Sequence, residues 1–90
     1  MGSQEFIQKC KELVHQYTLN HMDETDIKKK SSFQIDDVYV VWSTKVLQNN
    51  KALLSTNLPD GMYYEITYNG DKDEIYFDVY KKFENIKYEL

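Results

Sequence analysis

The most informative absence in this chain of 90 residues is arginine, because all eleven basic residues are lysine. The planar guanidinium fork of arginine is the usual group for bidentate recognition of phosphate and of guanine. Acidic residues are in excess, with a formal net charge of −4, and residues 57–90 hold eight acids and only four lysines. Because such a surface repels a polyanion, we expect no direct nucleic-acid partner.

Cysteine, glycine and long apolar runs are also scarce. Cys10 is the only cysteine, so an internal disulfide cannot form, which agrees with a reducing compartment. The three glycines form no spaced set, which excludes a glycine-rich phosphate loop. No apolar run approaches the roughly 18 residues that span a bilayer, and a secretory signal is missing. We therefore expect a cytoplasmic protein with no membrane partner.

The residues that are present predict a single domain, residues 1–90, whose first part is helical. Within residues 3–21 apolar side chains recur at steps of one, three and four, which predicts an amphipathic helix with Ser3 as its N-cap. The expected stripe consists of Phe6, Ile7, Cys10, Leu13, Val14, Tyr17 and His21. After it, Asp23 is a candidate cap for a short second helix, and an ordered loop is the alternative.

From Asp36 onward the period is near two, which indicates β-strands. "QNNK" favours a tight hairpin turn, since asparagine tolerates left-handed conformations. Further strands are expected in "MYYEITY" and "IYFDVYKKF", and residues 84–90 predict a turn and a fifth strand or, alternatively, a helix. A lone helix and a bare sheet are each unstable. We therefore predict an α+β fold, in which the N-terminal amphipathic helix packs on one face of a four- to five-stranded antiparallel meander sheet.

Strict alternation assigns the strand residues to two faces. The face toward the helix is expected to carry Val38, Val40, Trp42, Val46, Leu53, Met62, Tyr64, Ile66, Ile75, Phe77 and Val79. The opposite face then has more apolar and aromatic groups than a solvated face normally shows, which indicates that something covers it. We predict an interaction surface there, formed by Tyr39, Val41, Leu54, Tyr63, Glu65, Tyr76, Asp78 and Tyr80.

Three covers for that surface remain open at this point. Residues 22–33 or the C-terminal stretch could fold across it within the monomer. A second copy could pack face to face with it as a homodimer. A different protein could dock on it, because tyrosine offers a large, rigid contact area with a polar tip.

Candidate catalytic and metal-binding groups do not form a set on the predicted helix. Cys10 and His15 lie about 140° apart around a helix, so they do not form a nucleophilic pair. His15 and His21 lie six residues apart, whereas neighbouring metal ligands on a helix lie four apart. His21 with Asp23 and Asp26 could touch a metal, but such residues are more often structural. We expect no enzyme, no cofactor and no metal.

Two acids in the predicted sheet raise the question of strand register. If Tyr68 faces Ile75, then Glu65 faces Asp78, and like charges opposite each other are unfavourable unless a lysine or a cationic partner lies between them. A register two residues shorter places Glu65 opposite Tyr76 and avoids the clash. The shorter register is favoured, and no paired-carboxylate site is built on these acids.

Several motifs of the chain resemble a known family. These are "FIQKCKELVHQY", "VYVVW", "LQNNKALLST", "LPDGMYYEITYNGDK" and "YKKFEN". They are similar to a family of small uncharacterised proteins, a domain of unknown function, from phages, prophages and other mobile elements of low-GC Gram-positive bacteria. The likeness covers nearly the whole chain. It implies a genomic setting and no activity, so no functional residue can be carried over.

Together these features predict a non-catalytic protein-interaction protein, accessory or regulatory, of a phage or mobile element. Its partner is expected to be another protein or a second copy of itself. A structural homodimer in phage assembly is the alternative. A small-ligand-binding or enzymatic domain, with a cleft lined by tyrosines and Glu65 or Asp78, ranks last, and it would require a cavity of about 300 Å³ or more.

Overall fold

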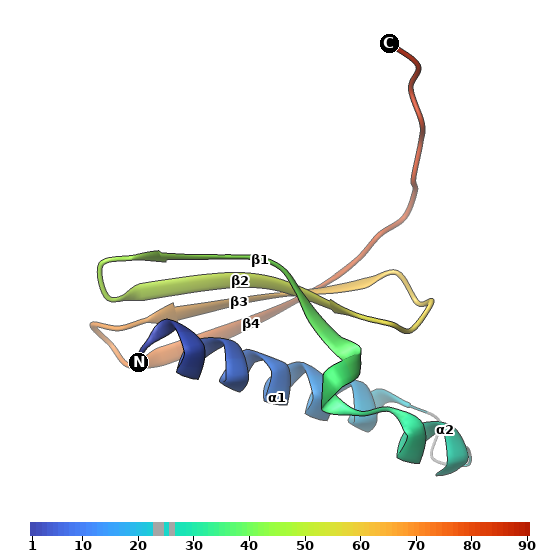
Figure 1. Ribbon diagram of the computed structural model, residues 1–90, viewed down its shortest axis with the longest axis horizontal. Helices are drawn as coiled ribbons and strands as arrows, with labels where there is room; N and C mark the ends of the chain where they lie inside the picture. The colour runs from blue at the N-terminus through green and yellow to red at the C-terminus, as the bar shows by residue number, and fades with distance from the viewer. Residues whose placement is uncertain (23–24, 26) are drawn as a thin grey trace.

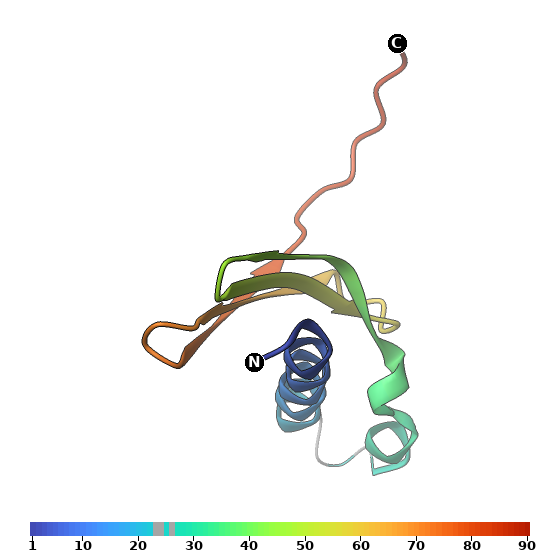
Figure 2. The ribbon, with the colours of Figure 1, turned by 60° about the vertical axis from the view of Figure 1, so that its left-hand side comes forward.

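A computed structural model describes every residue of the chain except 23, 24 and 26 (Figure 1). Its elements are helix α1 (Ser3–His21), helix α2 (Ile27–Ser32), the 3-10 turn η1 (Ile35–Asp37) and strands β1 (Val38–Val46), β2 (Asn49–Thr56), β3 (Met62–Asn69) and β4 (Glu74–Lys81). The strands form one antiparallel sheet in the order β1-β2-β3-β4. The sheet curves over α1, which packs on one of its faces (Figure 2). The predicted α+β fold is therefore confirmed, with four strands.

Helix α1 follows the predicted stripe closely. Its fully buried residues are spaced by four along one face: Phe6, Cys10, Val14 and Thr18. Ile7, Leu13 and Tyr17 flank this row as half-buried residues, whereas His21 is exposed. The helix begins differently from the prediction, because Gly2 is the N-cap and Ser3 is the first helical residue. No side chain caps this end, and the Gly2 carbonyl accepts the first helical hydrogen bond from Phe6 at 2.9 Å.

The segment after α1 returns along the helix. The predicted cap Asp23, together with Asp26, lies outside the described residues, and the expected short helix is present as Ile27–Ser32. Phe33 follows it and is buried. The His15 ring stacks on Phe33, and its Nε2 lies 3.1 Å from the Phe33 carbonyl oxygen. Since a carbonyl only accepts, this nitrogen is the donor. These contacts hold the segment on the helix side of the sheet.

The first hairpin turns at Leu47 and Gln48, so the predicted turn at "QNNK" is wrong. Leu47 adopts a φ of 57°, and Val46 pairs directly with Asn49. The asparagines are strand residues, and Asn50 is buried on the helix side. Val46, which was expected to face the helix, is 63% exposed.

A β-bulge in β1 inverts further face assignments. Val40 pairs with Leu54, but Trp42 pairs with Leu53, so Val41 is an extra residue in the ladder. An extra residue shifts every following side chain to the other face. Trp42 and Leu53 therefore lie on the face away from α1, and Leu54 is in the core with 0% exposure. The predictions for these three residues are wrong, and Leu54 cannot belong to an interaction surface.

Strands β3 and β4 pair with Tyr68 opposite Ile75, so the favoured shorter register is wrong. Glu65 does face Asp78. The observed register aligns the apolar residues of both strands on the helix side, which outweighs one like-charge pair. Lys51 of β2 also offsets the pair, because its Nζ lies 3.3 Å from a carboxylate oxygen of Glu65.

The turn between β1 and β2 contacts the turn between β3 and β4 at Gly70. The Gly70 N–H donates to Asn49 Oδ1 at 3.1 Å, and Gln48 Nε2 donates to Asp71 Oδ1. A Cβ atom at position 70 would lie 2.2 Å from the carbonyl oxygen of Gln48. Only glycine therefore permits this approach of the two turns.

We expect Gly70→Ala to lower the free energy of unfolding by about 1–3 kcal/mol, because the clashing atom belongs to the backbone and the turns must part. Lys72→Ala changes an exposed side chain in the same turn and is the control, with an expected effect within about 0.5 kcal/mol. Urea unfolding of both variants measures the difference. Equal stability of the two variants would show that the turns separate without cost.

Residues 82–90, here called the tail, form neither the predicted fifth strand nor the alternative helix. The Lys82 N–H donates to the Gly61 carbonyl at 2.8 Å, and the chain beyond leaves the sheet on the side away from α1 (Figures 1 and 2). The turn expected at Glu84 and Asn85 does not form, and all tail residues are exposed. Among the described residues, no helix has both the length and the hydrophobicity to cross a bilayer.

Candidate functional site

The face of the sheet turned away from α1, here called the outer face, has no described segment of the chain packed across it (Figure 2). Large side chains on this face are about half exposed: Tyr39 45%, Val41 45%, Trp42 42%, Tyr76 50% and Tyr80 52%. The segment from α2 to η1 lies on the helix side, and the tail projects away. A single copy of the chain therefore leaves exposed the surface that the sequence predicts to be covered.

Strand pairing brings most of the predicted interaction residues together. Tyr63 pairs with Tyr80, and the neighbouring outer row pairs Glu65 with Asp78. Tyr39 and Val41 on β1 and Tyr76 on β4 also belong to this face. Leu54 on β2 was predicted here but lies in the core. The sequence reasoning missed Trp42, because no signal in "VYVVW" reveals the bulge that turns it outward.

The charge of the outer face is mainly negative. Lys51 pairs with Glu65, while the exposed Asp78 has no ion pair with any residue that the structure describes. The Tyr76 hydroxyl donates to Glu74, and this hydrogen bond to a carboxylate is the main reason that the pKa of Tyr76 is raised. The tyrosine therefore stays a neutral donor beside an acid. A complementary partner would bring apolar groups together with lysine or arginine.

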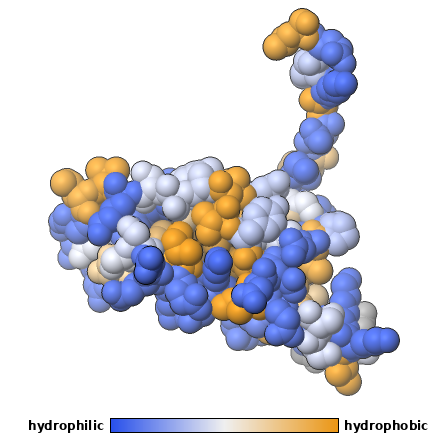
Figure 3. All heavy atoms as spheres, in the orientation of Figure 1, coloured by the Kyte–Doolittle hydropathy of each residue, from blue (hydrophilic) through white to orange (hydrophobic). Residues whose placement is uncertain are grey.

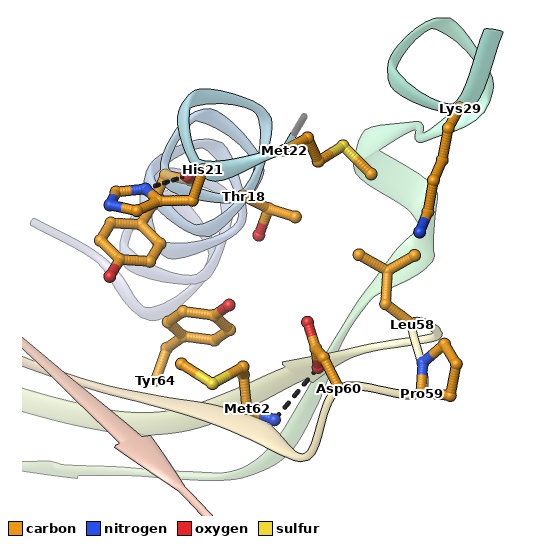
Figure 4. Close-up of a pocket in the computed structure, with 10 residues that line it drawn as sticks. Thr18, His21, Met22, Lys29, Leu58, Pro59, Asp60, Met62 and Tyr64 are labelled. Atoms are coloured by element: carbon orange, nitrogen blue, oxygen red, sulfur yellow. Dashed lines mark hydrogen bonds between the residues drawn. The ribbon is translucent and has the colours of Figure 1, made fainter. Parts of the chain in front are cut away.

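A second candidate site is a cavity of about 420 Å³ between the C-terminal part of α1 and the connection from β2 to β3 (Figure 4). Met22, Leu58 and Met62 form apolar parts of its wall. Its size exceeds the roughly 300 Å³ that a small-ligand site needs. Glu65 and Asp78, the acids expected in such a cleft, are not among its lining residues.

Polar groups converge on this cavity from separate elements. Thr18 of α1 and Tyr64 of β3 point toward it (Figure 4), and burial raises the pKa of the Tyr64 hydroxyl, which keeps it protonated. Asp60 Oδ1 accepts the Met62 N–H at 3.1 Å. His21 Nδ1 lies 2.9 Å from the Tyr17 carbonyl and must donate to it, so Nε2 is the acceptor in the neutral form of the imidazole. These groups suit ligand recognition, and none is an activated nucleophile.

Two further candidates for chemistry are the thiol of Cys10 and the set of His21, Asp23 and Asp26. Cys10 is completely buried in the core, and burial raises the pKa of its thiol to about 12, so it is not a thiolate nucleophile at neutral pH. The proposed metal set of His21, Asp23 and Asp26 lies partly outside the described residues. Among the residues that are described, no group of three or more histidine, cysteine or acidic side chains could hold a metal ion.

Comparison with protein families gave one result. The model of DUF6275, a family of unknown function, matches residues 7–90. The match runs from α1 to the end of the tail and so includes both candidate sites. It confirms the expected likeness to a family of unknown function. Comparisons with curated proteins and with solved structures gave no match.

Proposed function

Because the chain belongs to DUF6275, a family of unknown function, we propose its function from its geometry. It is a non-catalytic protein-interaction module that binds another protein through the outer face. One observation carries this proposal: large apolar and aromatic side chains there are about half exposed, and no described segment packs across them. The sequence resemblance supports the finer proposal of an accessory or regulatory protein of a phage or mobile element, acting in the host cytoplasm.

The composition of the outer face suits protein recognition. Tyrosine and tryptophan are the side chains that most often dominate binding energy at interfaces, because they bury much area at little entropic cost. Here Trp42, Tyr76 and Tyr80 stand on strands of one hydrogen-bonded sheet. A rigid scaffold of this kind loses little conformational entropy when a partner docks. Asp78 adds a preference for a basic partner.

The test is partner capture from a bacterial host, followed by calorimetry with the purified partner. Tyr76→Ala/Tyr80→Ala is expected to weaken binding at least about tenfold, since two interface aromatic residues each contribute about 1 kcal/mol or more. Both positions are half exposed, so the variant should stay folded. Ile27→Ala removes an exposed apolar side chain on α2 and is the matched control. Unchanged affinity of the double variant would remove the outer face as the binding surface.

The cavity beside α1 favours a second candidate function, the binding of a small ligand. Its volume and its convergent polar groups, Thr18, Asp60 and Tyr64, support this. The double variant and one further variant separate the two functions. Ligand binding in the cavity would survive Tyr76→Ala/Tyr80→Ala and would be lost when Leu58→Trp fills the space, as followed by amide NMR shifts.

A further inference from the structure

The tail has the sequence pattern of a β-strand and no strand partner within the described monomer. Ile86, Tyr88 and Leu90 alternate with polar residues, and each is more than half exposed. Figure 3 shows hydrophobic groups recurring among hydrophilic ones along this projecting segment. Exposure of these side chains gives the monomer no hydrophobic stabilisation. The family match runs to Leu90, so the tail belongs to the domain.

The open edge of β4 matches the tail in length. β4 is the last strand in the sheet order, so the backbone groups along one of its sides have no strand neighbour. β4 has eight residues, and eight more, residues 83–90, follow Lys82. Each stretch spans about 26 Å at 3.3 Å per residue. β4 contains no proline, and the unpaired backbone groups of an edge strand are a template for pairing with another chain.

We propose that two copies of the protein pair through residues 74–90, so that the tail of each copy adds as a fifth strand to the β4 edge of the other. Because the tail continues directly from β4, one twofold axis at the junction places both tails antiparallel to the partner edges. With this axis perpendicular to the sheet, facing residues of the two chains share a face. Even-numbered residues then face even-numbered residues. Tyr76 and Tyr80 of the outer face therefore lie on the same face as the apolar tail residues.

Charge complementarity selects the register. A register centred on Lys82 or on Glu84 would place two identical charges face to face, which is destabilising. A register centred on Phe83 instead places Glu84 opposite Lys82, an ion pair that the symmetry repeats. The same register places Ile86 opposite Tyr80 and Leu90 opposite Tyr76. The tail then lies beside β4 within the sheet and extends the outer face without covering it, so the inference does not depend on the proposed function.

Sedimentation equilibrium of the full chain is the first test, and we expect a concentration-dependent dimer that becomes a monomer when residues 83–90 are removed. Two triple variants test the strand geometry. Ile86→Ser/Tyr88→Ser/Leu90→Ser changes the apolar side of the tail and is expected to abolish the dimer. Asn85→Ser/Lys87→Ser/Glu89→Ser changes as many residues on the other side and should preserve it. Because the tail lies outside the core, neither variant is expected to unfold the domain.

A charge exchange tests the register. Lys82→Glu is expected to weaken the dimer roughly tenfold, since it creates two like-charge pairs, and Lys82→Glu/Glu84→Lys should restore it at unchanged net charge. A full chain that stays monomeric at millimolar concentration would overturn the proposal. Equal loss of the dimer in both triple variants, or no recovery in the exchanged variant, would also overturn it. Partner capture by the chain lacking residues 83–90 reports on the proposed function separately.

Discussion

Leu54→Ala is expected to lower the free energy of unfolding by about 2–5 kcal/mol, because it leaves a cavity in a core that the surrounding side chains cannot fill. Leu54 is completely buried against the residues of α1 and β3. Leu53→Ala, one position away, is the matched control, with an expected cost of about 1 kcal/mol. Leu53 is only half buried and lies on the outer face opposite Trp42. A chain of this size has a total stability of roughly 5–13 kcal/mol, so the first change is severe.

Urea unfolding of the two variants measures their free energies of unfolding. We expect the slope of this free energy against urea concentration to be the same for both. Strict alternation along the sequence predicts the opposite order, with Leu53 in the core. A larger loss in Leu53→Ala would therefore contradict the strand register, in which the bulge and the first turn together place Leu53 on the outer face. A larger loss in Leu54→Ala supports the outer face as the structure defines it.

The helix and the fold class could be predicted because their signals are unambiguous. The buried residues Phe6, Cys10 and Val14 repeat at a helical spacing, with two polar residues between each and the next. In β4 the charged Asp78 marks the side that faces away from the core. Tyr76 and Tyr80, two residues before and after it, therefore lie on that same face. Where apolar and polar positions are separated in this way, only one assignment buries the apolar groups.

The faces of β1 and β2 could not be predicted because their residues are apolar on both sides. In "VYVVW" and "ALL" every position is hydrophobic, so alternation does not show which residues face the helix. Shifting the assignment by one residue would bury apolar side chains equally well. The turn failed for a related reason. Local preference favours asparagine at positive φ, but the structure uses Asn49 to bind Gly70 and places the strained φ at Leu47.

The candidate sites differ in how visible they are in the sequence. Tyr76 and Tyr80 on the outer face follow from periodicity alone. The cavity does not, because its lining residues come from α1, α2, the connection around Pro59 and β3, which are far apart in the chain. Residues 84–90 alternate as a strand does, but the predicted fifth strand is wrong for a single copy of the chain, because no described strand pairs with these residues.

Above about pH 9 the stability of the protein is expected to fall steeply because of Cys10. Its thiol has an ordinary pKa of 9.0 in the unfolded chain, and burial raises this pKa to about 12 in the folded protein. Between these values the unfolded chain has lost the proton and the folded protein retains it, so raising the pH favours unfolding. The expected slope is about 1.4 kcal/mol per pH unit, or about 4 kcal/mol by pH 12. Below pH 9 this contribution is fully present and does not change.

Cys10→Ala isolates this effect, because it removes the thiol and no other titratable group. The variant loses some packing at every pH, so the informative quantity is the difference in slope and not the difference in stability. Between pH 9 and pH 10 the wild type should lose stability more steeply than the variant, and above pH 10 the buried Tyr64 and Tyr68, whose pKa values are also raised, should make both proteins less stable. Parallel curves from pH 9 upward would mean that solvent reaches the thiol. In that case water would reach the contact between the centre of α1 and the sheet. The core beneath the outer face would then be less tightly packed than the structure shows.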